Sequence, residues 1–71
     1  MISSEDLENW FTYHAPQAGQ QEKYLALRLA AKAFAVAVVE HTPSCPDQTV
    51  AVRKIREAVM VANQAIACGG R

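Results

Sequence analysis

The sequence contains few residues that break a helix. Three glycines and three prolines stand against thirteen alanines among 71 residues, a composition that favours helix. No apolar run reaches the roughly 18 residues that a membrane span needs. The first ten residues hold three acids and no base, which is unlike a signal peptide. We therefore expect a soluble, intracellular, all-α chain of one domain that does not contact a membrane.

An excess of one charge is also missing. Seven acidic residues balance seven basic ones, and the pI is about 6.7. A protein that binds duplex DNA normally carries a basic domain, so the balance predicts no DNA partner. Three of the acids lie in the first ten residues, however, and the rest of the chain holds seven bases and four acids. A local basic site is therefore compatible with the neutral total.

Cysteine is scarce, although a chain this short usually depends on a disulfide, a metal or a partner chain for stability. Cys45 and Cys68 lie near opposite ends of one predicted helix, roughly 34 Å apart at 1.5 Å per residue. A disulfide needs Cα atoms within about 7 Å of each other. His41 and Cys45 have a tolerable ligand spacing, but no second pair completes a tetrahedral metal site. We expect no internal disulfide, no metal and no cofactor, which leaves oligomerisation.

Capping residues and breakers divide the chain into one short and two long helices. Ser3 or Ser4 can cap the first, and Asp6 follows Ser3 at the spacing of a capping box. Pro16 suits the start of the second helix, although Gly19 weakens its first turn, so that a firm start near Gln20 is the alternative. The predicted helices cover residues 3–11, 17–41 and 45–68, with a loop over 12–16.

The ends of the two long helices are marked as well. Thr42-Pro43 ends the second helix, because a residue before proline avoids the helical region. Ser44 is expected to cap the third, with Asp47 three residues on, and Gly69-Gly70 to end it. Since the connection between them is short, the two long helices are predicted to pack antiparallel as an αα-hairpin.

Apolar residues recur every three or four positions along both long helices. The two stripes consist of Tyr24, Leu27, Ala31, Phe34 and Val38, and of Val52, Ile55, Val59, Ala62 and Ile66. Residues 33–39 contain no polar side chain, and a helix that is apolar all round has to be buried all round. One neighbouring long helix and one short helix cannot provide that cover. We expect further copies of the chain to cover it, because an exposed apolar patch is a liability for a monomer.

One face of the second helix combines a tyrosine with two cations. Tyr24, Arg28 and Lys32 follow one another at a spacing of four residues. Two like charges at this spacing are mildly destabilising, which suggests that an anion lies opposite them. A solvated basic edge beside the core is the plainer interpretation of the same spacing.

The loop before this row adds flat rings. Tyr13, His14 and Pro16 lie together outside regular structure, and such rings stack on nucleobases. His14 can donate a hydrogen bond to a phosphate or a base edge, and Arg28 and Lys32 can make charge-assisted bonds to phosphate. Together with Tyr24, these five residues predict a site for a small nucleotide with two negative charges.

Other notable residues have structural interpretations. Trp10 and Phe11 are expected to pin the first helix to the hairpin, and Arg53 to pair with Glu57 four residues later. Asn63 lies on a largely apolar segment and wants a partner; it either fixes the register of an assembly, which we favour, or touches a ligand. A basic cluster in the third helix is taken as solvated surface. It consists of Arg53, Lys54 and Arg56.

A catalytic arrangement is absent from the pattern. The sequence has no paired acids on one helix face, no glycine-rich phosphate loop and no nucleophile–base motif. His14 and His41 have no carboxylate at a fixed helical spacing beside them. We therefore expect a binding protein and not an enzyme.

Three motifs in a fixed order carry a resemblance to a known family. They are Tyr13-His14-x-Pro16, then Tyr24-x-x-x-Arg28-x-x-x-Lys32, then Arg56-Glu57-Ala58-Val59-Met60-x-Ala62-Asn63-x-Ala65-Ile66-Ala67. Together they resemble the phage-encoded cyclic-oligonucleotide sponges that counter the CBASS bacterial immune system. The resemblance covers about residues 10 to 68. It departs at Ala15, where many relatives are expected to have a second proline.

The resemblance implies a compact homohexamer that holds cyclic dinucleotides, such as 3′,3′-cGAMP, in pockets between protomers, in the cytoplasm of the infected bacterial host. Some relatives also hold cyclic trinucleotides at separate sites, and none cleaves its ligand. Tyr13 and Pro16 would then wall the bases, with His14 beside them in the same loop. Arg28 would bind phosphate with help from Lys32. Tyr24 would line the pocket or pack beneath it, and Arg71 would reach a phosphate of a neighbouring pocket.

Two alternatives come from other classes. The first is a structural or adaptor oligomer that binds another protein, in which replacing Arg28 or Tyr13 leaves the function untouched. The second is a small nuclease or phosphodiesterase, which would need a metal-binding acid cluster that the sequence does not contain. Recovery of intact ligand after binding separates a sponge from the second alternative.

Overall fold

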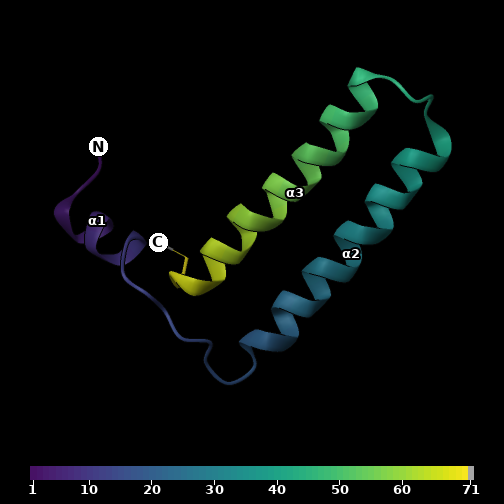
Figure 1. Ribbon diagram of the computed structural model, residues 1–71. Helices are drawn as coiled ribbons and strands as arrows, with labels where there is room; N and C mark the ends of the chain where they lie inside the picture. Colours follow the sequence, from purple (N-terminus) through teal and green to yellow (C-terminus); the bar gives the residue numbers. More distant parts are fainter. Residues whose placement is uncertain (71) are drawn as a thin grey trace.

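The computed structural model describes residues 1–70, and these form three helices and no strand. The helices are α1 (Ser4–Trp10), α2 (Gln20–His41) and α3 (Pro46–Ala67). Figure 1 shows α2 and α3 side by side and antiparallel, with α1 beside the C-terminal end of α3. The all-α hairpin predicted from the sequence is confirmed. Arg71 lies outside the described residues.

Helix α1 begins with the expected capping box. The Asp6 amide donates to Ser3 Oγ at 3.0 Å, and the Ser3 amide donates to Asp6 Oδ2 at 3.2 Å. Two of the amides that a helix N-terminus leaves unpaired are thereby satisfied. The acidic side chains of the first turn, Glu5 and Asp6, also suit the positive end of the helix dipole.

Helix α2 begins three residues later than the predicted range. Gly19 precedes it with φ of 83°, in the left-handed region, which glycine adopts at no steric cost. The chain therefore reaches helical geometry only at Gln20, and the connecting loop spans residues 11–19 instead of 12–16. The end of α2 is as predicted, because it stops at His41 and Thr42 is extended.

Helix α3 differs from the prediction at its start. Cys45, not Ser44, is the N-cap, and no side chain caps the helix. Pro46 occupies the first helical position, where its missing N–H costs nothing. Because a residue before proline is held in the extended region, the cap falls on Cys45.

The C-terminus of α3 forms the expected glycine cap. The Gly70 amide donates to Ala65 O at 2.9 Å, and the Gly69 amide donates to Ile66 O at 3.2 Å. Gly69 has φ of 67°. This pair of bonds is the Schellman motif, which satisfies carbonyls that a helix end otherwise leaves without donors.

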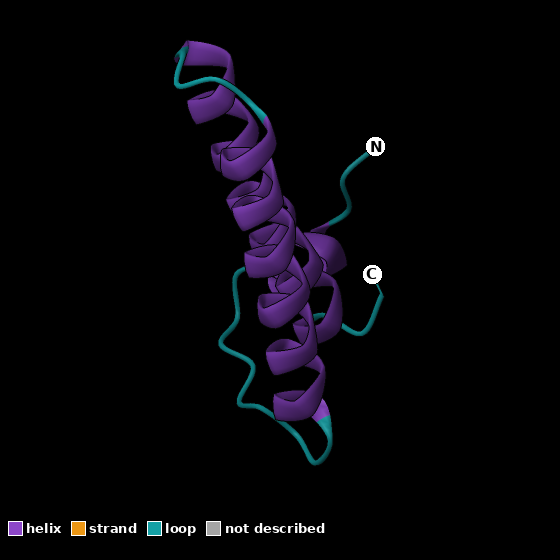
Figure 2. Cartoon of the chain, turned by 90° about the vertical axis from the view of Figure 1, so that its right-hand side faces the viewer, coloured by secondary structure: helices purple, strands orange, loops and turns teal. Residues whose placement is uncertain are grey.

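The chain is thin and exposes much of its surface. Its extents are 44 × 30 × 15 Å, and Figure 2 shows that the long helices form a single layer. The accessible surface is 5805 Å², whereas a compact monomer of this mass exposes about 4,400 Å². Among the described residues only Cys68 is buried. The hairpin therefore lacks a closed core of its own.

Two aromatic rings that the sequence predicts to pack against other groups are exposed in the single chain. Phe34 belongs to the α2 stripe, yet it is 61% exposed, and Phe11 is 82% exposed. The prediction that Phe11 pins α1 to the hairpin is thus wrong, because Phe11 lies past the last turn of α1. Trp10 is half-buried. No described helix is both long enough and apolar enough to cross a membrane.

Candidate functional site

Three cations line a groove on one side of the hairpin. Arg28 and Lys32 reach it from α2, one turn apart, and Arg56 reaches it from α3. The groove has a volume of about 350 Å³, and its floor is apolar. Its lining is completed by Ala31, Ala35, Val52, Ile55, Val59 and Met60. We call it the cationic groove.

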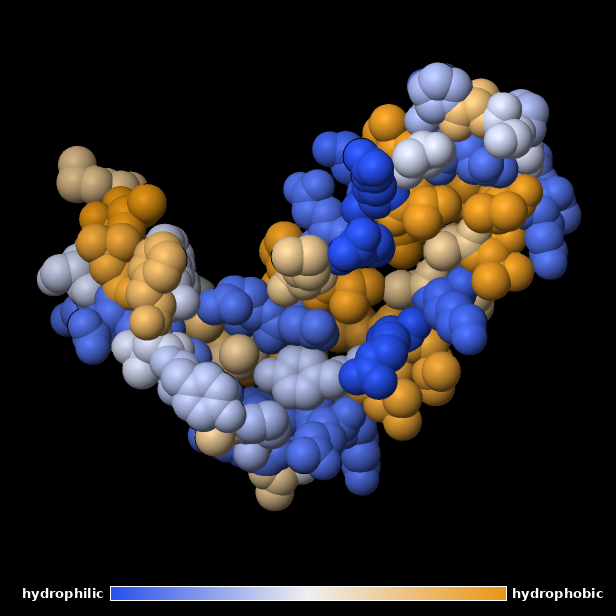
Figure 3. Space-filling view, viewed as in Figure 1, coloured by the Kyte–Doolittle hydropathy of each residue, from blue (hydrophilic) through white to orange (hydrophobic). Residues whose placement is uncertain are grey.

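None of these three cations is neutralised by the described part of the chain. The single salt bridge found there joins Lys54 Nζ to Glu57 Oε2 at 3.9 Å. Arg28, Lys32 and Arg56 are exposed and have no carboxylate within ion-pair distance among residues 1–70. Figure 3 shows the most hydrophilic side chains in groups over both long helices, with hydrophobic surface between them. The groove is suited to an anion that also carries flat apolar surface.

Arg56 is the residue that the sequence interpretation missed. It was grouped with Arg53 and Lys54 as solvated surface, but the structure separates the three. Lys54 lines a groove on the other side of the hairpin, and Arg53 lines neither groove. Antiparallel pairing of the two apolar stripes places Arg56, one residue after Ile55, next to Lys32. The register of the two stripes was therefore the feature of the sequence that could have identified Arg56 as a groove residue.

Glu57 also has a different partner from the one expected. It pairs with Lys54, three residues earlier, and not with Arg53. Both spacings put side chains on one helix face. The side chains of the observed pair are 72% and 67% exposed, and ion pairs this exposed contribute little to stability.

The loop that carries the predicted stacking rings lies apart from the cationic groove. Tyr13 is 84% exposed, Pro16 is exposed, and neither lines a groove of the hairpin. His14 lines a separate hollow at α1, together with Glu5, Glu8, Asn9 and Thr12. The structure therefore brings Arg28 and Lys32 together but does not bring the loop residues to them within one chain.

His14 has a defined hydrogen bond. Its Nε2 lies 2.7 Å from the carbonyl oxygen of Asn9. A carbonyl oxygen only accepts, so Nε2 carries the proton and donates. The other ring nitrogen, Nδ1, takes no part in this contact. Tyr24 is half-buried on α2, four residues before Arg28, and lines neither groove.

Asn63 retains an unpaired atom. Its Oδ1 is buried and has no hydrogen-bond partner among the described residues. A buried amide oxygen without a donor is costly, so such atoms nearly always have partners in finished assemblies. The observation agrees with the expectation that Asn63 needs a partner from elsewhere.

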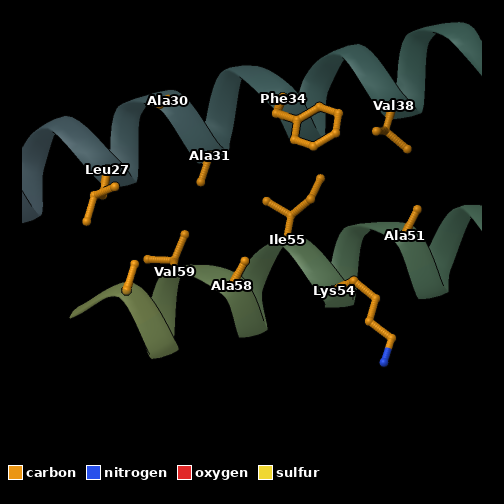
Figure 4. Close-up of a pocket in the computed structure, with 11 residues that line it drawn as sticks. Leu27, Ala30, Ala31, Phe34, Val38, Ala51, Lys54, Ile55, Ala58 and Val59 are labelled. Atoms are coloured by element: carbon orange, nitrogen blue, oxygen red, sulfur yellow. The ribbon is translucent and has the colours of Figure 1, made fainter. Parts of the chain in front are cut away.

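The opposite side of the hairpin is apolar. A groove of about 590 Å³ runs there between α2 and α3. Figure 4 shows Leu27, Phe34 and Val38 directed from α2 toward Ile55 and Val59 of α3, while Lys54 extends away from them. We call this the apolar groove. No group of three His, Cys, Asp or Glu side chains within residues 1–70 is placed to hold a metal ion.

Comparison with protein families gives one match. The family model described as Acb2/Tad1, hairpin domain, matches residues 3–67, nearly the whole chain. The matched range includes every helix and the loop before α2. Neither the curated proteins nor the solved structures contain a significant match to the chain.

Proposed function

Because the chain belongs to the Acb2/Tad1 hairpin family, the cyclic-oligonucleotide sponges that counter CBASS, we propose that it binds cyclic dinucleotides such as 3′,3′-cGAMP and holds them intact. The observation that carries this proposal is the cationic groove, with three unneutralised cations over an apolar floor. A cyclic dinucleotide has two phosphates of single negative charge and two flat bases. Cations and apolar surface in one groove match both parts of that ligand.

Each cation has a role in this arrangement. Arg28 binds one phosphate through its fork of N–H donors, which matches phosphate oxygens in a bidentate manner. Lys32 and Arg56 hold the second phosphate from the two walls of the groove. The apolar floor, which includes Val59 and Met60, excludes water beneath the sugar rings and strengthens these contacts.

The stacking rings come from a second copy of the chain. Tyr13 and Pro16 lie outside the cationic groove of their own chain but are fully available on its surface. A pocket between protomers, with the loop of one facing the groove of the other, would place the Tyr13 ring against a base. His14 then contacts a base edge through Nδ1, and Tyr24 supports the wall beside Arg28.

Self-assembly follows from the exposed apolar surface. The chain exposes about 1,400 Å² more than a compact monomer of its mass, and a standard interface buries about 800 Å² per partner. Each chain therefore has surface for more than one neighbour. We infer a homohexamer in which the apolar groove and Phe34, which is 61% exposed, are covered by other copies, and in which Asn63 Oδ1 gains a donor.

The setting of this activity is the cytoplasm of an infected bacterial cell, where the messengers of CBASS are made. Sequestration there keeps the messenger from its effectors, without any bond being broken. Cyclic trinucleotides are a second ligand class, because some members of the family hold them at separate sites. The principal alternative is a structural or adaptor oligomer, which the exposed apolar surface alone would also suit.

Calorimetric titration with 3′,3′-cGAMP, followed by heat denaturation and chromatography of the released ligand, tests the proposal. We expect saturable binding at less than one ligand per chain and recovery of intact ligand. Degraded ligand would indicate an enzyme. An absence of heat with every cyclic di- and trinucleotide would leave the adaptor oligomer.

A further inference from the structure

The loop over residues 11–19 has little packing of its own. Phe11 and Tyr13 are more than four-fifths exposed, and eight of its nine residues are classed as exposed, with only His14 half-buried. A loop held by so few apolar contacts would ordinarily sample many conformations. The contacts that tie it to the rest of the chain are instead hydrogen bonds at its two ends.

Both ends of the loop are tied to the C-terminal end of α3. At the upstream end, Asn9 Nδ2 donates to Cys68 O at 3.2 Å, and Gln64 Nε2 donates to Trp10 O at 3.4 Å. At the downstream end, Gln20 Nε2 donates to Ile66 O at 3.4 Å. These bonds join residues 46 to 59 positions apart in the sequence. We call the side chains of Asn9, Gln20, Gln64 and Cys68 the clasp.

The clasp also reaches into the loop itself. Gln20 Oε1 accepts from the Gln17 amide at 2.9 Å, so one amide side chain links the loop to α3. On the upstream side, Asn9 O accepts from His14 Nε2 at 2.7 Å and lies 3.7 Å from the Cys68 thiol. Gln64 Nε2 lies 3.0 Å from the same thiol. The residues on either side of Tyr13 and Pro16 are thus fixed to one helix end.

We propose that the clasp is a positioning device for the ligand site: Asn9, Gln20 and Gln64 hold the Tyr13 loop in its binding geometry before ligand arrives. This inference rests on the proposed function, because it assumes that Tyr13 contacts ligand. A loop ordered in advance loses less conformational freedom on binding, and the affinity is correspondingly higher. None of the three amides has to touch the ligand.

The turn at the far end of the hairpin provides a matched control. Gln48 Nε2 donates to Val39 O at 3.3 Å and to Thr42 O at 3.2 Å. Like Gln20 and Gln64, Gln48 is an amide side chain that joins a helix to a neighbouring segment of the chain. It lies at the N-terminal end of α3, whereas the clasp lies at the C-terminal end. Gln48→Ala therefore removes the same chemistry without touching the clasp.

The test is a double-mutant cycle on 3′,3′-cGAMP affinity, measured by calorimetry. We expect Asn9→Ala to weaken binding about fivefold, the value of one hydrogen bond, and Gln48→Ala to leave it unchanged. In a Tyr13→Ala background Asn9→Ala should cause a clearly smaller loss, because the clasp acts in large part through that ring. In an Arg28→Ala background its fivefold effect should persist. If Asn9→Ala does not fold, Gln20→Ala replaces it.

A second measurement needs no ligand. Backbone ¹⁵N order parameters of residues 11–19 should fall from about 0.85 toward 0.6 in Asn9→Ala and remain unchanged in Gln48→Ala. If Tyr13→Ala weakens binding but Asn9→Ala affects neither binding nor order, the clasp is overturned and the proposed function stands. An equal loss in the Tyr13→Ala background also overturns it. If the wild-type protein binds no ligand, the proposed function fails, and the order parameters alone decide whether the clasp orders the loop.

Discussion

One side of the α2–α3 hairpin is rimmed by Phe34 and Val38 and the other by Arg28 and Lys32 with Arg56, although the same two helices build both. Ala31, Ile55 and Val59 line the two grooves alike. The grooves therefore differ in their rims and not in their wall. A shift of one or two positions around a helix decides whether a side chain lines the apolar groove or the cationic groove.

The largest expected effect comes from placing a charge on the apolar side. In Phe34→Arg the ring that we propose is buried in the assembly, worth about 2–3 kcal/mol, is replaced by a cation that has no partner there. We expect the assembly to dissociate to smaller species in analytical ultracentrifugation. Gln21→Arg, at an exposed position of α2, introduces the same side chain and should retain the mass of the wild type. An unchanged mass for Phe34→Arg would show that this side is not an interface.

The reverse experiment removes charge from the cationic side. Arg28→Ala with Lys32→Ala deletes two charge-assisted contacts, each worth about 1.5–3 kcal/mol, and affinity for 3′,3′-cGAMP should fall at least 100-fold. The mass of the assembly should not change. Lys23→Ala with Arg53→Ala removes the same charge from exposed positions outside both grooves and should bind normally. Equal losses in both double variants would mean that only net charge matters.

A smaller effect is expected from the third cation alone. Arg56→Ala removes one contact from the α3 wall, and calorimetry should show a loss of about tenfold in affinity. Arg53→Ala, three residues earlier on the same helix but outside the groove, is its control. If Arg56→Ala binds with wild-type affinity, Arg56 does not contact the ligand and is solvated surface, as the sequence pattern suggested.

The smallest expected effect is that of salt, which needs no substitution and should act on the cationic groove but not on the apolar groove. Raising the salt concentration from 0.1 to about 0.5 M roughly halves the Debye length, so binding through exposed cations should weaken about threefold. Apolar cohesion is not screened, and the mass of the assembly should hold. If salt dissociates the assembly instead, ion pairs between chains are what hold it together.

The local features of the fold could be predicted from the sequence because they depend on neighbours in the chain. The capping box at Ser3, the end of α2 before Pro43 and the glycine cap after Cys68 are all fixed by residues within a turn of one another. The misplaced start of α2 and the misplaced cap of α3 have the same origin. Gly19 delays the start of α2 to Gln20, and Pro46 moves the N-cap of α3 from Ser44 to Cys45. In both cases the backbone restriction of glycine or proline outweighs the capping or start signal beside it.

The candidate site was less accessible to such reasoning. Arg28 and Lys32 share a helix, so their spacing was enough to place them together. Arg56 joins them only through the register of α2 against α3, and the clasp joins residues up to 59 positions apart. No local spacing encodes contacts of that kind. The sequence also could not tell that Phe11 would be exposed, since hydrogen bonds of Asn9 and Gln64 tie α1 to α3 without it.

The wall that the two grooves share has an evolutionary consequence. Ala31, Ile55 and Val59 form part of both surfaces, so a larger or smaller side chain at any of them alters two packing environments at once. Selection for a new ligand cannot act on these positions without also changing the packing on the other side of the hairpin. The rim residues carry no such double constraint. Lineages that adapt to a messenger with different bases are therefore expected to vary at the residues proposed to face the bases, Tyr13 and His14, and to keep both the wall and the cations proposed to bind phosphate.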